Sequence, residues 1–250
     1  MCIAIVQTPG SKRIDADVLR TCYRNNPHGA GLAYIKDGKV VTAKGYFSAD
    51  RFVEKYNAAY SRYGGSPMLI HCRIATSGAT DQNNCHPFQV ADGKLALIHN
   101  GILAPTVAKP TAKRSDTAVF AQFLRDAELR QIPDPAALQS IETIIGTSNK
   151  IAFLDSNGAY AIANEKQGHW INGVWYSNDT YRWDAYGTPW LDDDIDAPLW
   201  ADRQDGCMEC GQVLITKTEY RTDLCMECLL EAYEDARQEF AEHEIERIAK

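Results

Sequence analysis

The order of strand-like and helical segments constrains the fold of this chain most strongly. Strand-like segments occupy residues 2–7, 30–35, 39–43, 68–72 and 95–99, and four more follow at 151–155, 159–164, 169–172 and 174–178. Helices are expected over 15–24 and 48–63, from Ser115 and Asp116 onward, and from Pro133 or Pro135 to Gly146. An order of strands, then helices, then strands again predicts a layered α+β domain rather than a series of βαβ units.

Two of the expected helices carry a clear apolar face. Ser48 is expected to cap the first, and its apolar residues recur at intervals of three and four: Phe52, Val53, Tyr56, Ala59, Tyr60 and Tyr63. The second carries Val119, Phe120, Phe123 and Leu124.

Lys36, Asp37 and Gly38 are typical of a hairpin turn between two strands.

The chain is expected to divide into a body and a small acidic module. A chain of 250 residues can form one core of about 150 to 200 residues and a satellite. We expect a domain over 2–183, a linker over 184–206 and a module over 207–250. Residues 205–250 hold 12 acidic and 5 basic residues, which argues against nucleic-acid binding through this module. No apolar run approaches the roughly 18 residues of a membrane span, and the N-terminus does not resemble a signal peptide, so a cytoplasmic location is expected.

Four cysteines in the acidic module have the spacing of a metal site. Cys207, Cys210, Cys225 and Cys228 read C-x2-C-x14-C-x2-C, close to that of a zinc ribbon. A structural Zn²⁺ held by four thiolates is expected there, followed by a C-terminal helix; a disulfide framework is the alternative. Cys22, Cys72 and Cys85 lack such a pattern and are expected to be small buried apolar residues.

Cys2 is the first candidate for chemistry. Removal of Met1 would leave a cysteine with both a thiol and a free α-amine. An α-amine with a pKa of about 7.7 to 8.0 is a general base near neutral pH and can take the thiol proton. A small residue at the start of an edge strand is the alternative interpretation, so other residues must support a catalytic one.

Three further stretches supply that support. Residues 71–88, 99–103 and 115–120 read HCRIATSGATDQNNCHPF, HNGIL and SDTAVF. In this order behind Cys2, and with NPHGAGLAY at 26–34, they resemble the class II glutamine amidotransferases over roughly residues 2–180. The resemblance implies a four-layer αββα sandwich of the N-terminal-nucleophile hydrolase type and an enzyme that hydrolyses L-glutamine without a cofactor for that step.

The resemblance also implies roles for single residues. Cys2 would attack the side-chain amide and form a glutamyl thioester, while Asn100 and the backbone N–H of Gly101 would form the oxyanion hole. A planar guanidinium suits the α-carboxylate of glutamine and a carboxylate suits its α-ammonium, which assigns Arg73 and Asp116 to the amino-acid end. Thr76 would add a hydroxyl contact.

Structural alternatives remain for several of these residues. Arg73 can serve as an ion-pair residue, and Asp116 can cap its helix with Ser115. His71, His86 and His99 flank the motifs, but the mechanism needs no imidazole base, so they are expected to be supporting or core residues. His28 is expected to belong to the scaffold. Many members of the family have an aromatic residue where Ile74 stands and a histidine where Ser77 stands, which leaves the substrate open to revision.

Three functions therefore stay open at this point. The first is a glutaminase that supplies ammonia to an acceptor held by a separate synthase or ligase, since no synthase-like segment follows residue 183. The second is an amidohydrolase of the same mechanism acting on a different amide. The third is a non-catalytic adaptor that binds through its zinc ribbon.

Overall fold

The computed structural model describes residues 2–182. The predicted linker over 184–206, the four proposed zinc ligands and the predicted C-terminal helix lie outside the described residues.

The first sheet contains six antiparallel strands in the order β3-β2-β4-β1-β10-β9. Its two central strands are fully buried, which matches their continuous apolar sequences. The hairpin between β2 and β3 turns at Asp37 and Gly38, which both have positive φ, as the Asp-Gly sequence predicts. The strands are β1 (Ile3–Gln7), β2 (Ala30–Lys36), β3 (Lys39–Tyr46), β4 (Met68–Cys72), β9 (His169–Ile171) and β10 (Val174–Tyr176).

The second sheet contains four antiparallel strands in chain order: β5 (Phe88–Ala91), β6 (Leu95–Asn100), β7 (Lys150–Asp155) and β8 (Tyr160–Ala163). Strand β5 was not expected from the sequence. It is four residues long, so its alternation of buried and half-buried side chains covers only two periods, and its register with β6 shifts after Gln89.

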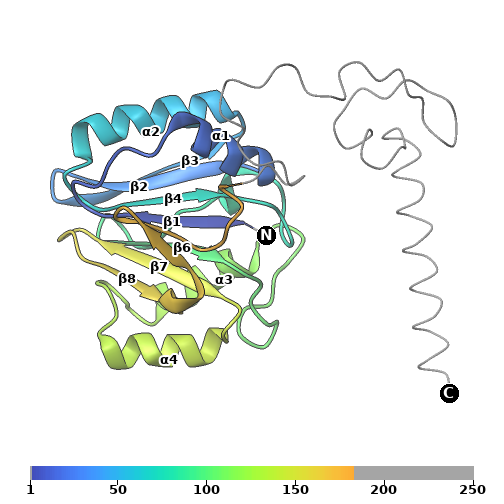
Figure 1. Cartoon of the computed structure of the whole chain (residues 1–250). Coiled ribbons are helices and arrows are strands. Elements are labelled where there is room, and N and C mark those ends of the chain that lie inside the picture. The colour runs from blue at the N-terminus through green and yellow to red at the C-terminus, as the bar shows by residue number, and fades with distance from the viewer. Residues whose placement is uncertain (1, 183–250) are drawn as a thin grey trace, which may run out of the picture. The chain divides into compact units, whose positions relative to one another are not determined.

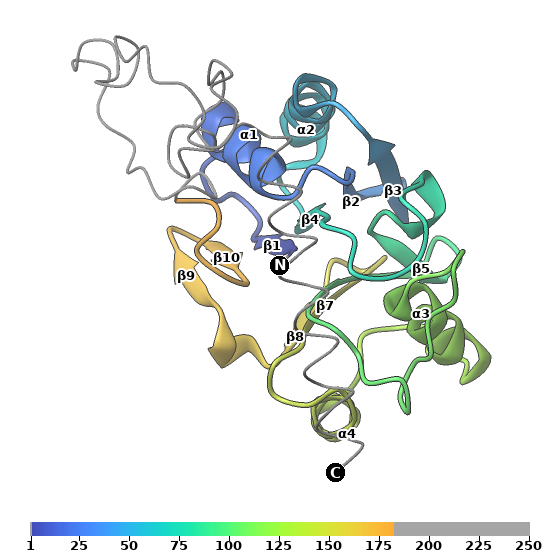
Figure 2. The ribbon, with the colours of Figure 1, turned by 90° about the vertical axis from the view of Figure 1, so that its right-hand side faces the viewer.

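The two sheets stack face to face, and helices cover both outer faces (Figure 1). Side chains such as Val6, Leu69, Ile98 and Leu154 form the core between the sheets. Helices α1 (Ala16–Asn25) and α2 (Ala49–Tyr63) cover the first sheet, and α3 (Asp116–Asp126) and α4 (Pro135–Ile145) cover the second (Figure 2). The predicted layered α+β architecture is confirmed for the described residues, with layers in the order helix, sheet, sheet, helix.

The helices begin and end close to the predicted positions. Ser115 caps α3 by accepting a hydrogen bond from Ala118 N, and α4 begins at Pro135 and ends before Gly146, whose φ is 75°. Ser48 occupies the N-cap position of α2, but its side chain makes no capping hydrogen bond, so that detail of the prediction is wrong. Phe123 is also 54% exposed, so it does not belong to the buried face of α3 as expected.

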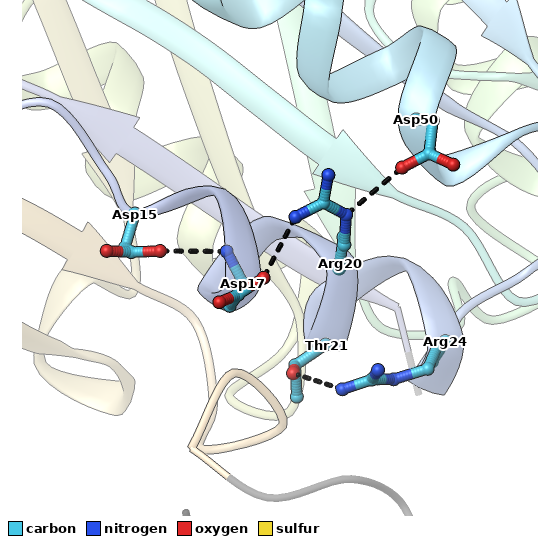
Figure 3. Close-up of polar contacts among 6 residues, drawn as sticks. All are labelled: Asp15, Asp17, Arg20, Thr21, Arg24 and Asp50. Carbon is cyan, nitrogen blue, oxygen red and sulfur yellow. Dashed lines mark hydrogen bonds and ion pairs between the residues drawn. The ribbon is translucent and has the colours of Figure 1, made fainter. Parts of the chain in front are cut away.

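Arg20 links the first two helices at the surface. Its guanidinium contacts Asp17 on α1 at 2.9 Å and Asp50 on α2 at 3.1 Å (Figure 3). All three side chains are well exposed, so these pairs contribute little to stability.

Within residues 2–182, none of the helices is long and apolar enough to cross a membrane.

Strand pairing brings distant parts of the sequence to one place. Strand β4 pairs with β1 so that Ile3 lies opposite Cys72, and Cys2 and Arg73 follow at the same end. Strand β6 of the other sheet ends at Asn100, whose side chain bonds to Cys2. The nucleophile candidate therefore lies where the ends of the two sheets meet.

Candidate active site

A small cavity of about 20 Å³ lies beside Cys2. It has room for roughly one water molecule. Residues from both sheets, the 74–79 loop and the start of α3 line it: Cys2, Arg73, Ile74, Thr76, Ser77, His86, His99, Gly101, Ser115, Asp116 and Thr117. The structure thus brings five of the candidate residues, Cys2, Arg73, Thr76, Gly101 and Asp116, around one cavity.

The Cys2 thiol is held by the backbone of one neighbouring residue. Sγ lies 3.3 Å from the carbonyl oxygen of Ile74 and accepts from the Ile74 N–H at 3.3 Å. Burial raises the pKa of the Cys2 thiol, while the Ile74 N–H and the nearby Arg73 charge act in the opposite direction. A raised pKa keeps the thiol protonated near neutral pH, so a base must take its proton before it can act as a nucleophile.

Arg73 carries a buried positive charge. The residue is 3% exposed, and its guanidinium donates to the carbonyl oxygens of Ser77 at 2.7 Å and Ala79 at 3.1 Å. It forms no ion pair with any of the described residues. A guanidinium that is buried without a carboxylate partner is costly, and an anionic ligand at the cavity would remove that cost.

Asp116 is the first residue of α3 and is 5% exposed. Its carboxylate accepts from Leu103 N at 2.8 Å and from Thr117 N at 2.7 Å. Ser77 joins it to the loop, since the Ser77 hydroxyl lies 3.4 Å from the carboxylate and accepts from Asp116 N at 3.3 Å. Asp116 therefore orders the start of its helix and also lines the cavity, so the structural and ligand-binding interpretations are compatible.

Asn100 is fully buried and contacts the backbone of the nucleophile. Its side-chain nitrogen donates to the carbonyl oxygen of Cys2 and, at 2.8 Å, to the hydroxyl of Ser177. Both amide hydrogens are therefore engaged, while Oδ1 is buried without a hydrogen-bond partner among the described residues. The predicted oxyanion donor lies next to Cys2 but points to the Cys2 backbone in this arrangement.

Position 101 requires glycine, both for its backbone conformation and for the space around it. Its φ is 146°, and a Cβ on it would lie 2.2 Å from Oδ1 of Asn149. Asn149 in turn accepts from His99 Nε2 at 2.9 Å. A side chain at position 101 would therefore displace the contacts of a buried histidine on the cavity wall.

Three histidines lie buried around the site. Burial lowers the pKa of His71 to about 3 and lowers the pKa values of His86 and His99 as well. His86 Nδ1 lies 2.6 Å from His71 Nε2, and His99 contacts Thr117 and Asn149. His71 Nδ1 has no partner among the described residues. Neutral, buried rings of this kind support the walls of the site, as expected from the sequence.

Three residues at the site were missed by sequence reasoning about catalysis. Ser177 and Asn178 follow β10, and Asn178 Nδ2 donates to the carbonyl oxygen of Cys2 at 2.7 Å. His28, expected to be scaffold, accepts from Ala75 N at 2.8 Å and so holds the 74–79 loop. The only sequence signal for Ser177 and Asn178 is a polar pair directly after a buried strand, which is too common to single them out.

Residues 2–182 hold no cluster of three or more histidine, cysteine or acidic side chains arranged to bind a metal ion. The predicted zinc ligands lie outside these residues. Of the remaining cysteines, Cys22, Cys72 and Cys85 are buried and unpaired, as predicted.

Comparison with known proteins relates the chain to glutamine-dependent enzymes. It is 25% identical over 165 residues to a glutamine–fructose-6-phosphate aminotransferase of Sulfolobus acidocaldarius, 29% over 124 residues to that of Cyanidium caldarium and 35% over 74 residues to that of Pyrococcus horikoshii. These matches cover 61%, 46% and 30% of this chain, but only 28%, 20% and 12% of the respective relatives.

A solved structure of glutamine phosphoribosylpyrophosphate amidotransferase from B. subtilis also matches, with a TM-score of 0.39 and 15% identity over 70% of this chain and 41% of that chain. No model of a protein family matches the sequence. The chain is thus similar over part of its length to glutamine–fructose-6-phosphate aminotransferases and spans less than a third of the length of these relatives.

Proposed function

We propose that this chain is a glutaminase of the class II, N-terminal-cysteine type, which hydrolyses the side-chain amide of L-glutamine and passes ammonia to an acceptor held by another protein. One observation supports this most directly. The thiol of Cys2 shares a single small cavity with a buried guanidinium and a buried carboxylate that do not pair with each other. An amino acid with both an α-carboxylate and an α-ammonium is the complementary ligand.

The proposed reaction begins with removal of Met1, which frees the α-amine of Cys2. The amine takes the thiol proton, and the sulfur attacks the side-chain amide carbon of glutamine. The C–N bond of the resulting tetrahedral intermediate breaks as the protonated amine returns the proton to the leaving nitrogen, so that ammonia departs and a thioester remains. Water then attacks the thioester with the amine as base, and glutamate leaves as the proton returns to sulfur.

The oxyanion of both tetrahedral intermediates needs hydrogen-bond donors. Asn100 and the backbone N–H of Gly101 are the proposed donors, because the first contacts the Cys2 backbone and the second lines the cavity. Both amide hydrogens of Asn100 are engaged in the present arrangement, so one must leave its acceptor when an oxyanion forms. One such donor contributes about 2.7 to 4 kcal/mol to transition-state stabilisation.

The clamp on the amino-acid end is proposed to consist of Arg73, Asp116 and Thr76. The guanidinium of Arg73 uses two N–H groups on the loop carbonyls, which leaves further donors for a carboxylate. The cavity beside Cys2 is small, and the 74–79 loop, which carries Thr76 and Ser77 on its wall, is proposed to lie further outward when glutamine is bound.

The acidic C-terminal module is proposed to bind structural zinc through Cys207, Cys210, Cys225 and Cys228 and to dock the ammonia-accepting synthase or ligase. Four-thiolate sites are usually closed and structural, which suits a docking element better than a catalytic one. Co-purification of the partner with a chain shortened at residue 206 would overturn the docking role while leaving the glutaminase proposal intact.

The experiment that tests the function is an intact-mass measurement of the untagged protein before and after 6-diazo-5-oxo-norleucine, a glutamine analogue that alkylates an activated thiol. We expect loss of Met1 and a single adduct, mapped to Cys2 and prevented by excess glutamine. Loss of Met1 without an adduct would overturn glutamine as the substrate; a panel of other amides would then test the amidohydrolase alternative. A Cys2→Ala protein is the matched control for labelling at the three buried cysteines of the domain.

A further inference from the structure

Ser177 ends the pairing between β10 and β1 in an unusual way. The register of the two strands places it opposite Ala4, and its N–H donates to the Ala4 carbonyl at 3.0 Å. In a regular antiparallel pair the N–H of Ala4 would donate to the Ser177 backbone carbonyl; here it donates to the Ser177 hydroxyl oxygen instead, at 2.9 Å. The hydroxyl therefore replaces the backbone carbonyl of Ser177 as the acceptor between the two strands. The chain after Ser177 is then able to leave the strand, and Asn178 reaches Cys2.

The same hydroxyl oxygen also accepts from the side chain of Asn100 at 2.8 Å. Ser177 is 1% exposed, so neither of these bonds competes strongly with water. One oxygen atom thus connects the strand that carries Cys2 with the residue that we assign to the oxyanion.

Asn178 fixes the nucleophile from the other side. Its Nδ2 donates to the Cys2 carbonyl oxygen at 2.7 Å. Its Oδ1 accepts from the N–H and the hydroxyl of Thr180, at 3.1 and 2.7 Å, which locks the orientation of the amide. The Cys2 carbonyl therefore has two amide donors, one from Asn100 and one from Asn178.

These bonds keep the buried acceptors around Asn100 satisfied when Asn100 changes partner. If Asn100 donates one hydrogen to an oxyanion, it must release either the Cys2 carbonyl or Ser177, because Nδ2 has only two hydrogens. The second donor, Asn178, keeps the Cys2 carbonyl bonded if Asn100 releases it, and Ser177 then still holds the other hydrogen of Asn100. No buried acceptor loses its last partner on this path.

We propose that Ser177 and Asn178 are positioning residues: they keep the buried hydrogen bonds around Asn100 satisfied and so allow Asn100 to turn from the Cys2 carbonyl to the oxyanion. The inference rests on the proposed glutaminase function. Neither residue touches the substrate, so their effect acts through Asn100 and the Cys2 backbone.

Three variants test the inference. Ser177→Ala removes the shared acceptor, and Asn178→Ala removes the second donor to the Cys2 carbonyl. Asn178→Asp keeps the acceptor for Thr180 but cannot donate to Cys2. The matched control is Ser140→Ala, which removes an exposed serine hydroxyl that bonds only within α4, to the Ala136 carbonyl at 3.0 Å.

The readouts separate positioning from a merely structural role. We expect kcat for glutamine to fall roughly 5- to 50-fold in the three test variants, with KM within about twofold, as loss of a transition-state interaction predicts. Alkylation of Cys2 by iodoacetamide displaces iodide and forms no oxyanion, so its rate is expected to stay within about twofold. Ser140→Ala is expected to keep the kcat of the unaltered chain.

The outcomes distinguish the inference from the function on which it rests. An unaltered chain that has lost Met1 but shows neither glutamate release nor labelling by the diazo analogue would overturn both. An active unaltered chain with kcat within twofold in Ser177→Ala and both Asn178 variants would overturn the inference alone. Equal losses in glutamine hydrolysis and iodoacetamide alkylation would also overturn it, because they would show displacement of the thiol rather than loss of oxyanion stabilisation.

Discussion

Arg73 and Asp116 line the same cavity without forming an ion pair, and both are held by Ser77. The guanidinium of Arg73 donates to the Ser77 carbonyl at 2.7 Å, and the Ser77 hydroxyl lies 3.4 Å from the Asp116 carboxylate. Two opposite charges kept apart by one intervening residue can each take the complementary end of an amino acid. Their separation is therefore central to the proposed substrate.

Arg73→Lys is expected to raise KM for glutamine roughly 10- to 100-fold, because an ammonium cannot form the paired hydrogen bonds of a guanidinium with a carboxylate. Steady-state kinetics with glutamine measures this. The control is 4-aminobutanamide, which is glutamine without its α-carboxylate: its hydrolysis, slow in the unaltered chain, should change less than about threefold in the variant. An equal loss for both amides would contradict carboxylate binding by Arg73.

Asn100→Ala is expected to lower kcat about 10²- to 10³-fold, corresponding to about 2.7 to 4 kcal/mol of transition-state stabilisation. The midpoint of thermal unfolding should move little, since Oδ1 of Asn100 makes no hydrogen bond among the described residues and Asn178 still donates to the Cys2 carbonyl. Kinetics and a thermal melt on the same preparation check both parts. A kcat within about threefold would exclude Asn100 as the oxyanion donor.

A protein that keeps a residue in front of Cys2 is expected to fold but to lack glutaminase activity. An acylated nitrogen has no basic lone pair, and the raised pKa of the Cys2 thiol makes a base necessary. The measurement compares one preparation before and after a protease removes an N-terminal tag to expose Cys2. Full activity with the tag in place would refute the N-terminal-nucleophile mechanism.

The buried histidines are expected to make the domain less stable in acid. Their pKa values are lowered in the folded state, so the unfolded chain binds more protons once the pH falls below about 6.5, the pKa of an unfolded histidine. The contribution is complete above that pH and is lost progressively as the pH falls toward about 3, the folded value for His71. Each histidine contributes up to about 1.4 kcal/mol per pH unit in this range.

NMR of the imidazole rings tests this sign directly. The resonances of His71 should not titrate between about pH 7 and 5.5 in the folded protein, and those of His86 and His99 should titrate below the pKa of an unfolded histidine. Urea unfolding should show a free energy that falls as the pH falls below about 6.5. Titration of all three rings near pH 6.5 would contradict the burial effect.

The purified full chain is expected to contain one equivalent of zinc. Replacement of any one of Cys207, Cys210, Cys225 and Cys228 by serine should lower the zinc content and leave labelling of Cys2 by the diazo analogue unchanged. Elemental analysis measures the metal, and Cys2→Ala, which should retain zinc, is the control. A metal-free full chain with disulfides among these cysteines would support the alternative interpretation.

The sequence was most informative where the pattern is long and regular. The apolar face of α2 was predicted because its residues recur at intervals of three and four, and the buried strands β1, β4, β6 and β7 were predicted because each is a short run of mostly apolar residues. Strand β5 was missed because it is four residues long with a shifted register. The exposure of Phe123 was missed because sequence periodicity shows which side of a helix is apolar but not how much of that side the rest of the protein covers.

The residues of the candidate site also fall into two groups, those that sequence motifs identify and those that only the folded structure brings to the site. Motif order placed Cys2, Arg73, Asn100 and Asp116 near one another, and the folded chain brings them together. Ser177 and Asn178 could not be found in this way, because their role depends on the register of β10 against β1. A register between strands about 170 residues apart is a property of tertiary pairing, which local sequence does not encode.

The small cavity beside Cys2 has a thermodynamic consequence for any ligand. If the site admits glutamine only when the 74–79 loop lies outward, the measured dissociation constant equals the intrinsic one divided by the fraction of molecules in that open state. A chain that is open about 1% of the time would bind about a hundredfold more weakly than its contacts allow. Any protein that favours the open loop would then raise the affinity for glutamine by up to that factor without touching the amino acid.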